Sequence, residues 1–193
     1  MTDVLVVGLG NPGDRYAGTR HNVGADVVAL LARRHDGRLR PDPKVHASVA
    51  DVRIAGRRVT LAVPLTYMND SGQAASALLR RAGTDAADMV VVHDELDLEP
   101  GRVKVKEGGG LAGHNGLRSL QAHLHTSDFL RVRLGVGKPP GGGAKGADWV
   151  LSKVPARVRG ELDVMVERAA DAVELLVTDG AAAAMQRVNA APA

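Results

Sequence analysis

Apolar residues recur along the chain with two spacings, and each spacing predicts a different secondary structure. Short apolar or alternating runs are typical of strands, whereas apolar residues three and four apart are typical of one face of a helix. The first spacing predicts strands over residues 3–8, 47–54, 57–63, 89–97, 102–108 and 129–137. The second predicts helices over residues 23–35, 114–124, 155–178 and 180–188, and between possible caps at 69–71 and a stop at Gly83.

The order of these elements predicts the fold class. Strand–helix units are mixed with hairpins, and the stretch "KPPGGGAKG" (residues 138–146) is typical of a flexible loop. No internal repeat or linker divides the chain. We therefore predict a single globular α/β domain over residues 1–193, with a mixed β-sheet flanked by helices on both faces.

The composition bears on where the protein works. The 193 residues include no cysteine, which excludes disulfides and thiolate metal ligands within this sequence. No basic stretch followed by a long apolar segment marks a signal peptide at the N-terminus. No apolar run approaches the length of a membrane span. We expect a cytoplasmic protein with no membrane contact.

Charge is unevenly distributed along the chain. Residues 101–153 hold nine basic and three acidic residues, so this segment carries +6 while the whole chain carries +3. Such an excess favours a polyanionic partner such as nucleic acid, although a solvated surface is an equally simple interpretation. The four aromatic residues are scattered, which argues against a platform that stacks several bases.

The N-terminal glycines look at first like a dinucleotide-binding loop. Gly8, Gly10 and Gly13 fit G-x-G-x-x-G after an apolar run. A dinucleotide loop needs a helix that starts at the third glycine and holds the pyrophosphate, but the helical pattern begins only near residue 22. The acidic residue expected about 20 residues further on, at the end of a second strand, is also missing. We therefore expect these glycines to shape a tight exit from the strand.

Polar side chains gather at four junctions between a predicted strand and a loop or helix. These are Asn11, Tyr16, Arg20, His21 and Asn22; Tyr67, Met68 and Asn69; His93, Asp94 and Glu95; and His114 and Asn115. Junctions of this kind can converge on one edge of a sheet, where open α/β sheets place their sites. Asn69 could instead be an ordinary helix cap, and each polar loop could be ordinary surface.

The residue types favour general-base chemistry. The chain has no cysteine nucleophile and no serine within G-x-S-x-G. None of its histidines shows H-E-x-x-H spacing, and we expect no metal or other cofactor. A neutral histidine can take a proton from water, a buried aspartate can fix its tautomer, and asparagine NH₂ groups can stabilise an oxyanion. Such a set can activate water against an ester.

Five segments resemble those of bacterial peptidyl-tRNA hydrolases. They are "GLGNPGDRYAGTRHNVG", "PLTYMNDSG", "HDELDLEPG", "GGGLAGHNGL" and "FLRVRLGVGKP", in the family order. The resemblance implies a monomeric α/β enzyme that needs no metal. It also implies a carboxylic ester hydrolase that cleaves the bond between a peptide and the 3′-terminal ribose of tRNA. That reaction returns tRNA to translation after ribosomes stall.

The resemblance further implies roles for residues at matching positions. His21 matches the general base and Asp94 the carboxylate that holds it. Asn11 matches a residue that separates N-blocked from free aminoacyl-tRNA, and Asn115 matches one that positions the water or the tRNA end. Contacts with the tRNA terminus are implied for Tyr16, Tyr67, Met68, Asn69 and Asn115, and a clamp for the 5′-phosphate and acceptor stem for Lys104, Lys106 and Arg133. Lys104 and Lys106 are two apart on a predicted strand, so both should point to one face.

Two alternatives stay open at this point. Some relatives of the fold bind RNA without hydrolysing it, but a binding module has no need of a base such as His21. Another esterase could use the same His–Asp pair on a small substrate, but it would not need the basic segment at residues 101–153. Salt dependence distinguishes the two kinds of substrate, because only phosphate contacts weaken steeply with ionic strength.

Overall fold

A seven-stranded mixed sheet forms the centre of the computed structural model, which describes residues 3–141 and 146–192. The strands are β1 (Val4–Gly8), β2 (Arg40–Asp42), β3 (Ala47–Ile54), β4 (Arg57–Pro64), β5 (Met89–Glu95), β6 (Val103–Glu107) and β7 (Leu130–Gly135). They lie in the order β2-β3-β4-β1-β5-β7-β6. β4, β1, β5 and β7 are mutually parallel, whereas β2–β3, β3–β4 and β6–β7 are antiparallel pairs. The predicted mixed sheet is confirmed.

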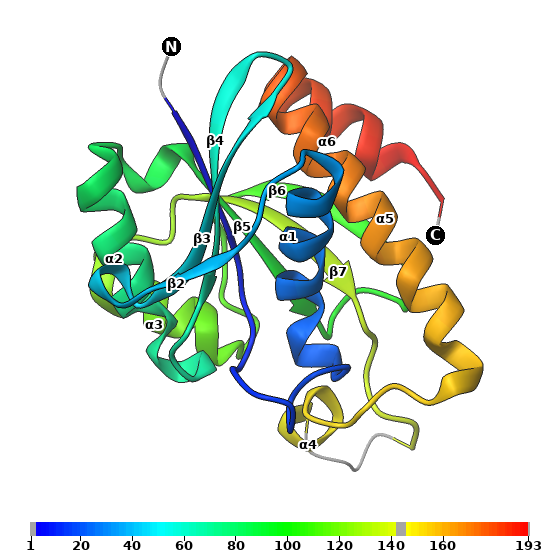
Figure 1. Cartoon of the computed structure of the whole chain (residues 1–193). Helices are drawn as coiled ribbons and strands as arrows, with labels where there is room; N and C mark the ends of the chain where they lie inside the picture. Colours follow the sequence, from blue (N-terminus) through cyan, green and yellow to red (C-terminus); the bar gives the residue numbers. More distant parts are fainter. Residues whose placement is uncertain (1–2, 142–145, 193) are drawn as a thin grey trace.

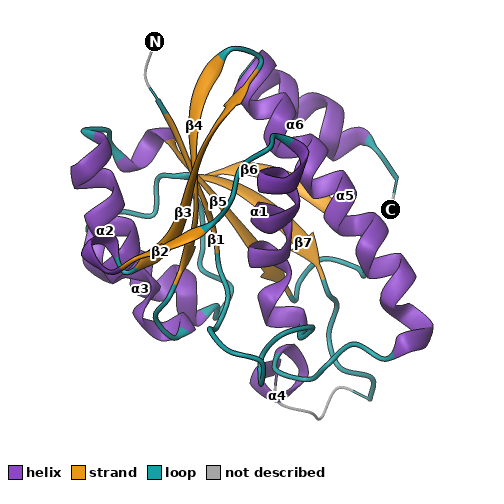
Figure 2. Cartoon of the chain, in the orientation of Figure 1, coloured by secondary structure: helices purple, strands orange, loops and turns teal. Residues whose placement is uncertain are grey.

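Helices cover both faces of this sheet, as the sequence predicts (Figures 1 and 2). They are α1 (Val23–Arg34), α2 (Ser71–Ala82), α3 (Asn115–Leu124), α4 (Gly146–Val150), α5 (Ala156–Asp179) and α6 (Ala181–Ala190). Helices α1, α5 and α6 pack on one face, and α2 and α3 pack on the other. Among the described residues, no helix combines the length and the apolar character that a membrane span needs.

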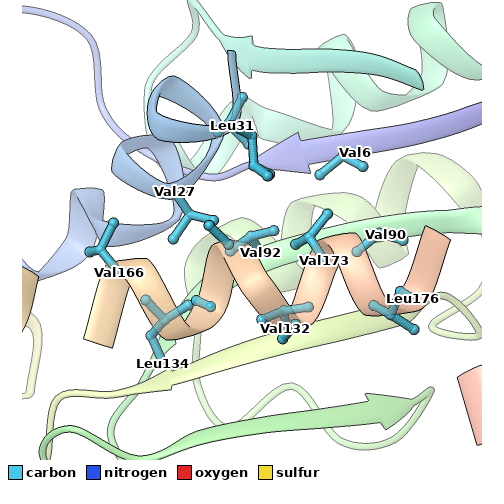
Figure 3. Close-up of a cluster of buried hydrophobic side chains, with 14 of the residues drawn as sticks. Val6, Val27, Leu31, Val90, Val92, Val132, Leu134, Val166, Val173 and Leu176 are labelled. Carbon is cyan, nitrogen blue, oxygen red and sulfur yellow. The ribbon is translucent and has the colours of Figure 1, made fainter. Parts of the chain in front are cut away.

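The central strands are buried on both sides, which explains their uninterrupted apolar sequences. In β1, Val6 points into the core under α1 and α5, while Leu5 and Val7 point into the core under α2 and α3. Figure 3 shows the first of these cores. Strand and helix side chains meet there: Val6, Val90, Val92, Val132 and Leu134 on the strands, and Val27, Leu31, Val166, Val173 and Leu176 on α1 and α5.

The topology gathers several loops at one edge of the sheet. Because β1, β4, β5 and β7 are parallel, their carboxyl ends meet at the same edge. The segment 108–113 returns the chain to this edge from the far end of β6. Glu107 pairs with Leu130 at the start of β7, whereas His114 reaches Asp94 near the end of β5.

Two glycines allow α1 to touch the backbone of the central strands. A Cβ atom on Gly24 would lie 2.2 Å from the carbonyl oxygen of Val92, and one on Gly8 would lie 2.3 Å from the carbonyl oxygen of Gly24. The third glycine of the motif, Gly13, lies in the loop with φ +93°, and α1 begins only at Val23. The loop therefore lacks the helix start of a dinucleotide site, as the sequence indicates.

The sequence does not predict two short elements, β2 and α4. β2 has three residues, including Pro41, and α4 has five, so neither is long enough to show a periodicity. Pro41 is tolerated because β2 is an edge strand. The loop predicted over 138–146 falls partly on residues 142–145, which lie outside the described residues.

The close contact of α1 predicts a large effect of one methyl group. Gly24→Ala should lower the free energy of unfolding by about 3 kcal/mol, because its Cβ meets backbone that cannot move aside. Gly160 in α5 has no atom within 4 Å of its ideal Cβ position. Gly160→Ala should therefore raise the free energy of unfolding by about 0.5–1 kcal/mol. Urea unfolding measures both, and equal effects would contradict the packing argument.

Candidate active site

Asp94 on β5 joins two histidines from different segments. Nδ1 of His21 lies 2.9 Å from both carboxylate oxygens, and Nε2 of His114 lies 2.8 Å from Oδ1. His21 comes from the 3₁₀ turn η1 (Arg20–Asn22) after β1, and His114 precedes α3. All three residues are buried, with at most 8% of each exposed. The structure thus brings together His21 and Asp94, as predicted, and adds His114.

The hydrogen bonds fix the tautomers of both rings. Nδ1 of His114 accepts the backbone N–H groups of Gly116 and Leu117 at 3.0 and 3.3 Å, so its proton is on Nε2 and is donated to Asp94. His21 donates from Nδ1 to the same carboxylate, which leaves the lone pair on its Nε2. His21 is therefore the ring of the pair with a free basic nitrogen.

The carboxylate at the centre stays ionised. Burial alone would raise the pKa of Asp94, but the electrostatic interaction with His114 and the hydrogen bonds donated by His114 and His21 outweigh it and hold the pKa well below its usual range. The facing atoms of His21, Asp94 and His114 lie within 4.8 Å of one another, a set that could hold a metal ion. Two shared protons already account for this arrangement, since each facing nitrogen donates to the carboxylate.

Asn11 lies in the loop after β1 and is held in one orientation by hydrogen bonds. Its backbone N–H donates to Oδ1 of Asn22 at 2.9 Å, and Nδ2 of Asn22 donates to the carbonyl of Asn11 at 2.9 Å. The side-chain Oδ1 of Asn11 accepts the backbone N–H of Met68 at 2.7 Å. Because the oxygen is occupied, the NH₂ group is what Asn11 can offer to a substrate.

The residues expected at the tRNA terminus differ in exposure. The rings of Tyr16 and Tyr67 meet edge to face with centroids 6.2 Å apart, and 58% of Tyr67 is exposed. Met68 is buried, and a Cβ atom on Gly116 would lie 2.6 Å from its sulfur, so Met68 packs against the start of α3. Asn69 is exposed, and the residue before α2 is Asp70. The cap interpretation of Asn69 is therefore wrong.

A cavity of about 100 Å³ opens beside His21. Its lining includes Asp94, Asn115 and residues of α4, among them Ala147 and Val150. A larger hollow of about 500 Å³ lies between α2 and the β2–β3 end of the sheet, and none of its described lining residues belongs to the predicted site. We place the candidate site at the smaller cavity because the His–Asp chemistry lies there.

The segment before His21 is held against α4 and the residues that follow it. The guanidinium of Arg20 lies over the ring of Trp149, 3.6 Å from its centroid, and donates to Oγ of Ser152 at 2.7 Å. The backbone N–H of Val154 donates to the carbonyl of Gly18 at 3.1 Å. In Figure 1, α4 lies beside the loop that follows β1. These contacts hold α4 beside the cavity, and no pattern in the sequence predicts them.

The predicted clamp residues share one face of the β6–β7 pair. Lys104 is opposite Arg133, and Lys106 is opposite Arg131 in the antiparallel register. Arg133 is bound by Glu95, with Nη2 2.8 Å from Oε1. Within the described part of the chain, neither lysine forms an ion pair. The two lysines are therefore the available cations, while the charge of Arg133 is partly neutralised.

Arg131 has a structural role, although in the sequence it looks like its neighbour Arg133. It is 2% exposed, and its Nη atoms donate to the carbonyls of Gly109, Gly110 and Ser127 at 2.6–3.0 Å. It thus fastens the glycine-rich segment that leads to His114 and Asn115. The sequence pairs Arg131 with Arg133 in a period-two pattern, and only the presence of a glycine segment nearby hints at the difference.

Comparisons with known proteins identify relatives of this chain. A family model described as peptidyl-tRNA hydrolase matches residues 5–193. The peptidyl-tRNA hydrolase of Cutibacterium acnes is 52% identical over 96% of this chain and 97% of its own length, and that of Rhodococcus erythropolis is 50% identical with the same coverage. A crystal structure of peptidyl-tRNA hydrolase from Acinetobacter baumannii has a TM-score of 0.90 and 40% identity, covering 97% of this chain and 94% of that one.

The buried ring of His93, next to Asp94, predicts a pH dependence of stability. Burial, followed by the neighbouring His114, lowers the pKa of His93 to about 3. The unfolded chain takes up a proton below about pH 6.5 while the folded one does not, so stability falls as the pH falls. Between pH 6.5 and 5 this residue should cost about 1–2 kcal/mol.

The test compares urea unfolding at several pH values for the wild type and His93→Gln. The glutamine does not titrate, so the variant should lose less stability over this range. His125→Asn replaces an exposed histidine and should leave the slope unchanged. The same slope in the wild type and His93→Gln would contradict the interpretation.

Proposed function

The chain belongs to the peptidyl-tRNA hydrolase family, and we propose that it cleaves the ester between peptide and tRNA by activating water with His21. The observation that carries this proposal is the pair of hydrogen bonds between Nδ1 of His21 and Asp94, both 2.9 Å long. They leave the Nε2 lone pair of a buried histidine free beside the cavity. A base in this state is ready to accept a proton from water.

The proposed reaction follows from this arrangement. Nε2 of His21 takes a proton from water as the oxygen attacks the ester carbonyl, and a tetrahedral oxyanion forms. Asp94, which remains a carboxylate, stabilises the imidazolium. The imidazolium then returns its proton to the ribose oxygen as the carbon–oxygen bond breaks. The products are the peptide carboxylic acid, which ionises by releasing a proton to solvent, and tRNA with its 3′ end restored.

Two asparagines are suited to hold the substrate during this step. The NH₂ group of Asn11 is left over after its oxygen accepts the Met68 N–H. Asn115 is an exposed residue at the start of α3 and lines the cavity with His21. We assign the NH₂ group of Asn11 to recognition of the blocked amino end, and Asn115 to positioning the water or the tRNA terminus.

The surroundings of the cavity fit a nucleic-acid substrate. Tyr16 lies on the same loop as Asn11, and Tyr67 and Asn69 lie on the segment after β4 that contacts Asn11, so all three can meet the terminal nucleotide. Lys104 and Lys106 offer charges for the 5′-phosphate and acceptor stem, and Arg133 adds a charge shared with Glu95. Contacts of this kind position any tRNA without reading its sequence. All of these residues come from one chain, so we propose that a monomer is sufficient.

Removal of the His21 side chain tests the proposed reaction. His21→Ala should lower turnover of N-blocked aminoacyl-tRNA at least about a hundredfold, because the general base is lost. Release of deacylated tRNA is the measurement, and free aminoacyl-tRNA should be spared by the wild type. His46→Ala changes an exposed histidine outside the site and should have no effect. Undiminished activity of His21→Ala would refute the role, and tRNA binding without cleavage by the wild type would indicate an RNA-binding protein.

Removal of the Lys106 side chain tests the proposed phosphate clamp. Lys106→Ala should raise KM and leave kcat nearly unchanged, since a phosphate contact contributes to binding. The slope of log KM against log salt concentration should fall by about one unit. Lys44→Ala removes an exposed lysine near β2, at the opposite edge of the sheet, and should change neither quantity. An unchanged salt slope in Lys106→Ala would remove Lys106 from the clamp.

A further inference from the structure

The outer edge of β6 is completed by a side chain. Asn189 on α6 accepts the backbone N–H of Val105 with Oδ1 at 2.8 Å and donates from Nδ2 to the carbonyl of Val105 at 2.9 Å. A carboxamide carries the same donor and acceptor pair as a peptide unit. Asn189 therefore takes the place that one residue of a further strand would occupy at this edge.

This contact acts on the residue between the two lysines of the clamp. Val105 is 2% exposed, and its side chain packs in the core beneath α5 and α6. Lys104 and Lys106 flank it, and strand geometry sends both of their side chains to the opposite face. The inner edge of β6 is held by β7 and the outer edge by Asn189, so the peptide units that carry both lysines are fixed from two sides.

We propose that Asn189 is a positioning residue for tRNA binding, which acts through Val105 on Lys104 and Lys106. The proposal rests on the clamp of the proposed function. Asn189 itself touches no substrate. Its amide keeps β6 in register and flat against β7, so that both ammonium groups are presented at a fixed separation to the phosphates. The C-terminal helix would thus contribute to substrate affinity from the far side of the strand.

The variant Asn189→Leu tests this proposal, because leucine is of similar size and cannot pair with Val105. We expect KM for blocked aminoacyl-tRNA with a 5′-phosphate to rise about three- to tenfold, the scale of one charge-assisted contact partly lost. For the same tRNA without its 5′-phosphate, KM should change by less than about twofold. The value of kcat should be unchanged for both substrates. Gln186→Ala, an exposed change on the same helix, is the matched control.

A direct measurement accompanies the kinetics. Amide hydrogen exchange at Val105 should become faster in Asn189→Leu and stay unchanged in Gln186→Ala. The variant Asn189→Asp keeps an acceptor for the Val105 N–H but cannot donate to the carbonyl when ionised, and it should show the same selective loss. This variant also serves if Asn189→Leu does not fold.

The outcomes separate this proposal from the proposed function. Equal rises in KM for both tRNAs would mean that Asn189 only supports the fold, and so would a fall in kcat; either result would overturn the proposal. Unchanged kinetics with faster exchange at Val105 would overturn it as well. If Lys106→Ala showed no dependence on the 5′-phosphate, the clamp itself would be refuted and this proposal with it. A phosphate-dependent Lys106→Ala beside a phosphate-independent Asn189→Leu would refute only the role of Asn189.

Discussion

A single buried carboxylate organises the site. Asp94 lies near the carboxyl end of a central strand, where an unpaired charge would be costly, and it is satisfied by N–H groups from His21 and His114. One histidine arrives from the loop after β1 and the other from the start of α3, so the carboxylate aligns two segments that are distant in sequence. The two histidines differ in the role of the ring nitrogen that does not contact Asp94. In His114 it caps a helix, and in His21 it remains free for chemistry.

Much of this arrangement can be predicted from the sequence, because long elements have clear periods. The six longer strands and the helices of ten or more residues follow apolar spacing. The parallel strands place Asp94 near the end of one strand and His21 in the segment that follows another. What cannot be predicted depends on contacts between distant segments. His114 becomes a partner of Asp94 only because the glycine-rich segment returns to the sheet edge. β2 and α4 are too short for any period to show.

The basic residues show why a count of charges overstates the binding surface. Arg131 and Arg133 alternate on one strand and are indistinguishable in sequence. The first is buried and holds the carbonyls of a glycine segment, and the second is bound by Glu95. Lys104 and Lys106 are not buried, and neither forms an ion pair in the described part of the chain. The sequence alone does not show which basic side chains are buried, which are ion-paired and which can bind a phosphate. The packing is needed to tell them apart.

Arg20 and Ser152, which are joined by a hydrogen bond beside the cavity, are made at different times during translation. The two residues are 132 positions apart, and α4 lies just before the later one. A nascent chain carries His21 and Asp94 well before it carries the α4 residues that line the cavity beside them. The side of the cavity formed by α4 therefore exists only after synthesis has passed Ser152, so the His–Asp pair precedes part of its own surroundings in the order of translation.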